Sequence, residues 1–137
     1  MDMNEFNLKV IEEFRANAGK VGGQFAGAPM LLLITTGARS GKTYTNPLVY
    51  SRDGDRIVII ASKAGAPKNP SWYHNLLAHP TPTLEVGTER FKAKATIASG
   101  AERERLFDQQ AAKMPFFKEY QKKTTRQIPV VILERTA

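Results

Sequence analysis

The chain has 137 residues, of which 42% are hydrophobic, and this suffices for one globular domain with a core. It contains no cysteine, which excludes disulfides, thiolate metal sites and a cysteine nucleophile and agrees with a cytoplasmic protein. The net charge of +7 makes a surface that attracts nucleic acid, anionic lipid or an acidic small molecule.

The first part of the chain predicts a helix followed by strands. Phe6, Val10 and Phe14 recur every four residues, so we expect an amphipathic helix over residues 4–19. Neither this start nor any later run resembles a secretory signal or approaches the ~20 apolar residues of a membrane span. Three strand-like segments follow, separated by short turns: Met30–Thr36, Thr43–Ser51 and Arg56–Ser62. We expect these segments to form an antiparallel meander.

The second part of the chain mixes helices and strands. A short helix, two hairpin strands, two helices and a last strand are expected over residues 71–79, 83–86, 90–97, 101–113, 116–124 and 127–134. Pro129 suggests that the last strand is an edge strand or begins there. The order of elements favours an α+β fold, a small, mostly antiparallel closed or split β-barrel with flanking helices. We expect residues 1–137 to form a single domain.

The segment GARSGKT, Gly37–Thr43, is close to a phosphate-binding loop. It has one residue too few between its glycines, and it leads into a strand instead of opening a helix. We therefore reject a nucleoside-triphosphatase, although the segment still fits an anion. No serine lies in a nucleophile-elbow motif, and the two histidines, His74 and His79, share one short segment, so we expect neither a catalytic triad nor a metal site.

Four basic residues belong to two loops, the turn after the first strand and the loop after the third: Arg39, Lys42, Lys63 and Lys68. In a meander both loops emerge at one end of the sheet, which would gather the four cations around one mouth. Hydrogen-bonding and aromatic groups fall in the same segments: Thr35, Thr36, Ser40, Ser62, Trp72, Tyr73, Asn75 and the amides of Gly37 and Gly41. This set suits a planar aromatic ligand with an anionic tail. Solvated loop charges and core packing of the aromatic pair are the alternatives.

Taken together, these motifs resemble one known family. They are TTGARSGK at 35–42, NPL at 46–48, the DGD hairpin at 53–55, IASKAGAPKNP at 60–70, WYHNL at 72–76 and FFKEYQKKTTRQIPVVILE at 116–134. The combination, which covers nearly the whole chain, resembles the deazaflavin-dependent nitroreductase family of actinobacteria. Its members are oxidoreductases with an FMN-binding split-barrel-like fold that bind coenzyme F420.

The resemblance implies an F420H2-dependent reductase that transfers a hydride to an electron-poor acceptor such as a quinone, enone or nitro compound. It implies catalytic roles for Ser62 and Tyr120, and a first turn that grips the phosphate and oligoglutamate tail. The cofactor contacts carried over from the family are Ala38, Arg39, Ser40, Gly41, Lys42, Thr43, Thr45, Asn46, Pro47, Leu48, Val49, Ile60, Ala61, Ser62, Lys63, Lys68, Ser71, Trp72, Tyr73, His74, Asn75 and Phe117.

The chain departs from the family's nitroimidazole-reducing member at three pocket positions. Val49, Met114 and Phe117 stand where that member has aromatic hydroxyl groups. The pocket is then more apolar and has fewer hydrogen-bond donors. We hypothesise a different acceptor selectivity, for quinones or other hydrophobic acceptors rather than bicyclic nitroimidazoles.

Several alternatives stay open at this point. The chain could be a split barrel that binds flavin mononucleotide or haem, or a carrier that stores the deazaflavin without catalysis. A nucleic-acid-binding module is disfavoured, because aromatic residues do not alternate with Arg and Lys on consecutive strands. The N-terminal helix either caps the barrel or contacts the inner membrane face peripherally. A monomer and a homodimer are both compatible with the sequence.

Overall fold

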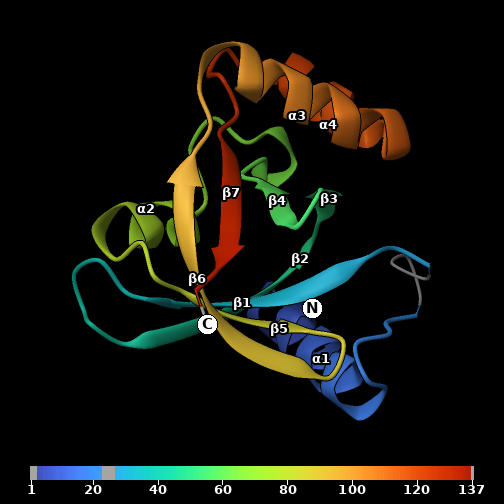
Figure 1. The fold of residues 1–137 in the computed structure, drawn as a ribbon, viewed down its shortest axis with the longest axis vertical. Helices are drawn as coiled ribbons and strands as arrows, with labels where there is room; N and C mark the ends of the chain where they lie inside the picture. The colour runs from blue at the N-terminus through green and yellow to red at the C-terminus, as the bar shows by residue number, and fades with distance from the viewer. Residues whose placement is uncertain (1–2, 23–26, 137) are drawn as a thin grey trace.

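Seven antiparallel strands form one curled sheet in a computed structural model that describes residues 3–22 and 27–136 (Figure 1). The strands are β1 (Met30–Thr36), β2 (Thr43–Val49), β3 (Ser51–Asp53), β4 (Arg56–Ile60), β5 (Thr83–Val86), β6 (Glu89–Ile97) and β7 (Val130–Arg135). Their order across the sheet is β2-β1-β5-β6-β7-β4-β3. The predicted α+β, mostly antiparallel architecture is confirmed.

The long strand β6 joins the two halves of the sheet. Its first residues pair with β5, and residues 93–97 pair with β7. Figure 1 shows β1, β2 and β5 running across the molecule while β6 and β7 stand nearly upright. This crossing produces the open side of the split barrel.

The predicted three-strand meander is wrong. The segment 43–51 does not form one strand, because the chain bends at Tyr50, whose N–H donates to Pro29 O at 3.0 Å. As a result β2 pairs with β1 at one edge of the sheet, whereas β3 pairs with β4 at the opposite edge. Pro129 lies just before β7, which is a central strand, so the edge-strand interpretation is also wrong.

Alternating residues of the strands fill separate clusters on the two faces of the sheet. On β1, Leu31 and Leu33 face one cluster, whereas Met30 and Leu32 belong to another beneath the N-terminal helix. That helix, α1 (Met3–Ala16), ends three residues before the predicted Gly19. Its Val10 and Phe14 are buried, so they cap the barrel. Among the described residues, no helix is both long and apolar enough to cross a bilayer.

Four further helices lie within the described residues. They are η2, a short 3₁₀ helix (Lys63–Gly65), α2 (Ser71–Ala78), α3 (Gly100–Lys113) and α4 (Phe116–Lys122). Trp72 and Leu76 of α2 pack inside the curled sheet. Phe107 of α3 and Phe117 of α4 pack on the outer face of β4 and β7. The helices therefore cover both faces of the upright half of the sheet.

An ion cluster ties the β3–β4 hairpin to α3 and gives a first prediction. Asp53 accepts two hydrogen bonds from Arg105, at 3.0 and 3.1 Å, and a further one from Arg56. These guanidinium groups, Arg105 first, hold the pKa of Asp53 well below its ordinary value. A lowered folded-state pKa stabilises the protein above the unfolded-state value, near 3.9, and this contribution is lost as the pH falls. Asp53→Asn should therefore destabilise the protein at pH 6, with a difference from wild type that shrinks towards pH 3.

Urea denaturation of both proteins between about pH 6 and pH 3 measures this difference. Arg105→Ala is the control, because it removes the main partner and should weaken the same pH dependence. A destabilisation by Asp53→Asn that stays constant over the range would contradict the role given to this ion cluster.

Candidate functional site

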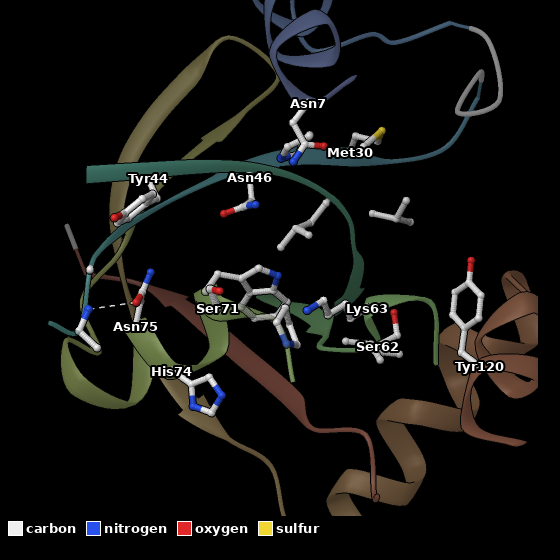
Figure 2. Close-up of a pocket in the computed structure, with 18 of the residues that line it drawn as sticks. Asn7, Met30, Tyr44, Asn46, Ser62, Lys63, Ser71, His74, Asn75 and Tyr120 are labelled. Atoms are coloured by element: carbon white, nitrogen blue, oxygen red, sulfur yellow. Dashed lines mark hydrogen bonds between the residues drawn. The ribbon is translucent and has the colours of Figure 1, made fainter. Parts of the chain in front are cut away.

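A cavity of about 1080 Å³ opens between β2, α2, α4 and the loop that contains η2 (Figure 2). Its apolar walls include Leu48, Ile60, Trp72 and Phe117. Figure 2 shows Asn46 projecting from β2 into the space above Ser71 and Lys63. The cavity is therefore mostly apolar, with a few polar groups that could orient a flat ligand.

The turn Gly37–Thr43 forms one end of the cavity. Its own hydrogen bonds shape it, because Gly37 N donates to Lys42 O at 2.7 Å and Gly41 N donates to Gly37 O at 3.1 Å. Gly41 has a φ of +70°, which a tight turn of this kind requires. The amides of Gly37 and Gly41, expected to meet an anion, are thus engaged within the turn. The side chains of Arg39 and Ser40 line the cavity, and Ser40 Oγ also accepts from Lys42 N at 3.2 Å and pairs with the Tyr44 hydroxyl at 3.2 Å.

Asn75 of α2 fixes this turn. Its side-chain oxygen accepts from Ala38 N at 3.0 Å, and its Nδ2 donates to Thr35 Oγ1 at 3.1 Å. Only 8% of Asn75 is exposed, and the Thr35 partner is buried as well. Asn75 lines the cavity, but its two hydrogen bonds make it a link between α2 and the end of β1.

The opposite end of the cavity is aromatic. Figure 2 places Tyr120 of α4 far from Tyr44 and Asn75, with Ser62 on its side of the cavity. The rings of Phe116, Phe117 and Tyr120 form a cluster with centroids 4.5 to 6.0 Å apart. Such contacts hold the rings in defined orientations. This end offers apolar surface together with the Tyr120 and Ser62 hydroxyls.

Most of the predicted site residues line this one cavity. They are Ala38, Arg39, Ser40, Asn46, Pro47, Leu48, Val49, Ile60, Ser62, Lys63, Ser71, Trp72, His74, Asn75, Phe117 and Tyr120. Other predicted residues are not among those that line it: Gly41, Lys42, Thr43, Thr45, Ala61, Lys68 and Tyr73. The aromatic pair divides, because Trp72 is buried against the core and also borders the cavity, whereas Tyr73 packs only at the edge of the core.

Sequence reasoning missed five lining residues: Asn7, Met30, Tyr44, Pro70 and Phe116. The period-two alternation of β2 places Tyr44 on the same face as Asn46 and Leu48, so this signal could have found it. Asn7 carried no such signal, because its position depends on how α1 packs against the sheet.

The expected cluster of four cations forms only in part. Arg39 and Lys63 line the cavity, whereas Lys42 and Lys68 do not. The predicted meander does not bring these residues together, since β2 and β4 lie in different halves of the sheet. Both loops border the same cavity, and Asn75 of α2 bonds the first of them to the helix that follows the second.

The family model for F420H(2)-dependent quinone reductases matches residues 8–135. The chain belongs to this family. An F420H(2)-dependent quinone reductase of Mycobacterium tuberculosis is 41% identical over 128 residues, which are 89% of this chain and 85% of the relative. A second, putative F420H(2)-dependent quinone reductase of the same organism is 37% identical over 105 residues, 77% of this chain and 88% of the relative.

Solved structures agree with the family. A chain described as an F420-H2 dependent reductase is 40% identical, with a TM-score of 0.71, over 77% of this chain and 94% of that one. A chain described as a domain-swapped dimer is 36% identical, with a TM-score of 0.73, over 93% of both. The haem storage protein HutZ of Vibrio cholerae, at 15% identity and a TM-score of 0.59, shares only the fold. The predicted split-barrel fold, the F420H2-dependent reductase activity and the cofactor are confirmed at the level of this family.

Proposed function

We propose that the cavity binds reduced F420 and that the electron acceptor is a quinone. The observation that carries this proposal is the polarity of the cavity, with Arg39 and Ser40 at the turn and aromatic side chains at the α4 end. A flat deazaflavin ring needs apolar walls, and its phosphate and glutamate tail needs cations, so the residues present fit the group. When bound, the reduced deazaflavin supplies the hydride.

The protein's own residues have separate tasks in this proposal. Arg39, Ser40 and Lys63 bind the anionic tail and the polar edge of the ring, and Trp72 with Ile60 forms apolar walls that exclude water. A quinone needs a proton as well as a hydride to become a hydroquinone. In this proposal the hydroxyl of Tyr120 donates a hydrogen bond to the acceptor carbonyl and the proton comes from solvent; Ser62 lies toward the same end of the cavity and supports this assignment. These groups orient the reactants, and the proposed hydride transfer requires no protein nucleophile.

The hydroxyl-poor wall supports a quinone over a nitroimidazole. Val49 and Phe117 line the cavity, whereas Met114 packs against the cluster beneath α4 and is not a lining residue. Two of the three substitutions therefore bear directly on the acceptor. Each missing donor removes a hydrogen bond worth about 1 kcal/mol, about a fivefold change in selectivity, so the two together amount to more than about tenfold.

Steady-state assays with reduced F420 test this proposal. Menadione, a quinone, should be reduced with a kcat/KM at least about tenfold above that of a bicyclic nitroimidazole. The variants Val49→Tyr and Phe117→Tyr introduce hydroxyl groups at these positions. They should bring the kcat/KM for menadione and that for the nitroimidazole closer together. Rapid nitroimidazole reduction by the wild type would contradict the proposed acceptor class, and no reduction of either compound would contradict the catalytic role.

Arg39 and Lys42 form a matched pair for the proposed tail contact. Arg39→Ala should weaken F420 binding by about tenfold or more, because a charge-assisted hydrogen bond contributes about 1.5–3 kcal/mol. Lys42→Ala removes an equal charge from the same turn at a residue outside the cavity lining, so its effect should be smaller. Fluorescence titration measures both. Unchanged affinity in the double variant would rule out the tail contact at this turn.

We also propose that the chain acts as one cytoplasmic domain. Burial of Val10 and Phe14 supports capping of the barrel by α1, and Leu8, 59% exposed, is an apolar side chain of α1 that is accessible for peripheral contact with a membrane. The domain-swapped relative supports a homodimer over a monomer. Co-sedimentation with anionic vesicles and light scattering test these two points separately.

A further inference from the structure

The guanidinium of Arg126 is bonded to one loop by four hydrogen bonds. Nε donates to Ala66 O at 2.9 Å, and Nη2 donates to Ser62 O at 2.7 Å. Nη1 donates to Ala61 O at 3.2 Å and to Asn69 Oδ1 at 2.7 Å. All four acceptors belong to residues 61–69, called here the 61–69 loop. One side chain therefore joins both ends and the middle of this loop.

Arg126 makes no ion pair with any residue that the structure describes. Burial lowers its pKa, although an arginine stays charged at physiological pH. A partly buried cation without a carboxylate is costly unless neutral acceptors satisfy its donors. Here the carbonyls of the loop do so, which means that the loop and the guanidinium stabilise each other.

The 61–69 loop needs such support because its backbone is unusual. Lys63 has a φ of +46°, which a residue with a β-carbon adopts at a cost. Gly65 has a φ of +79°, and a β-carbon there would lie 2.7 Å from Tyr120 O and 2.9 Å from Lys123 Cβ. The loop is thus pressed against α4, the helix that carries Tyr120.

Arg126 is itself held in place by its neighbours. Gln121 Nε2 donates to Arg126 O at 2.8 Å, and Gln121 Oε1 accepts from Arg103 Nη2 at 3.0 Å. Arg103 is buried and also donates to Ile128 O at 2.6 Å. A hydrogen-bond network therefore connects α3 and α4 to the segment that carries Arg126.

We propose that Arg126 is a positioning residue, which holds Ser62 and Lys63 at the cavity wall against the helix that carries Tyr120. The proposal rests on the proposed function of this cavity. In it, Arg126 keeps the wall that meets the deazaflavin at a fixed distance from the helix that meets the acceptor. Arg126 is not among the residues that line the cavity, and four of its five donors are bonded to the loop, so we assign it no ligand contact.

The test compares Arg126→Lys and Arg126→Ala with the wild type. A lysine presents its three donors at one point and cannot span the acceptors of the loop. Both variants should lose hydrogen-exchange protection at the amides of Gly65 and Ala66, which donate to Ser62 O and Lys63 O. Both should bind F420 about tenfold or more weakly. Guanidinium at tens of millimolar, far below denaturing concentrations, should restore binding in Arg126→Ala and leave Arg126→Lys unchanged.

Arg135→Ala is the matched control, because it removes an exposed arginine bonded to Glu89, away from the cavity. It should change neither exchange at the loop nor F420 affinity. A folded Arg126→Ala variant with wild-type protection and affinity would overturn the proposal. So would a loss of F420 affinity in Arg126→Ala that guanidinium does not reverse. If Arg126→Ala does not fold, Arg126→Lys decides by exchange and affinity alone.

Failure of this proposal is distinguishable from failure of the proposed function. A wild type that does not bind F420 contradicts the function of the cavity. Exchange at Gly65 and Ala66 then still reports whether Arg126 holds the loop, because this measurement needs no ligand.

Discussion

Replacing Gly65 by alanine should lower the free energy of unfolding by about 3 kcal/mol and reduce F420H2 oxidation at least about tenfold. Two costs combine at this position. The φ of +79° is unfavourable for a residue with a β-carbon, and that carbon would lie 2.7 Å from the backbone oxygen of Tyr120. A backbone atom cannot rotate away as the end of a side chain can, so η2 and α4 must separate. This separation would move Lys63 away from Tyr120.

Gly54→Ala is the matched control for the Gly65 substitution. Gly54 has a φ of +63°, but a β-carbon there meets nothing within 4 Å. It should therefore incur only the backbone cost, about 1 kcal/mol, with normal activity. Urea denaturation and F420H2 oxidation are measured on both variants. The comparison separates the cost of the positive φ from the cost of the contact between the new β-carbon and α4. Equal effects of the two substitutions would refute the close contact between η2 and α4.

Asn75→Ala should destabilise the protein by about 2–3 kcal/mol and weaken F420 binding as well. The substitution leaves the buried Thr35 hydroxyl without its partner and releases Ala38 N. The turn that presents Arg39 would then keep its internal hydrogen bonds and the one between Ser40 Oγ and the Tyr44 hydroxyl. Loss of both stability and affinity is expected for a residue that holds a binding turn in place through buried hydrogen bonds.

A double-mutant cycle with Thr35→Val tests the Asn75 link. The two substitutions should be less than additive, because each removes the same hydrogen bond. Asn17→Ala serves as the control, since the Asn17 side chain donates a local hydrogen bond to Glu13 O on the surface. Full additivity, or an effect no larger than that of Asn17→Ala, would argue against the link.

The sequence predicted the elements of the fold well but not how they pair. Period and composition sufficed for the helix at 101–113 and for the hairpin of β5 and β6, because these patterns are local. The break at Tyr50 and the placement of β2 and β3 at opposite edges depend on long-range pairing and on the curl of the sheet. No local pattern encodes that choice, so the simplest connectivity, a meander, was expected instead.

The candidate site was predictable to a similar extent. Motif resemblance led to Arg39, Ser62 and Trp72, which the structure brings to one cavity. The resemblance gave no role to Arg126, although this residue lies within one of the recognised motifs. Its hydrogen-bond partners lie about sixty residues away in the chain. Supporting residues of this kind show themselves only through tertiary hydrogen bonds. Asn7 was missed for the same reason, since only the packing of α1 brings it to the cavity.

The central claim is that this cavity holds reduced F420 while a quinone accepts the hydride. A single-turnover experiment tests it most directly: protein loaded with reduced F420 is mixed with menadione, and the absorbance of the oxidised deazaflavin is followed. We predict oxidation that is much faster than in free solution and is slowed in Arg126→Lys. Tight binding with oxidation no faster than in solution would indicate a carrier, and displacement of F420 by flavin mononucleotide would indicate another cofactor. Either result would contradict the account.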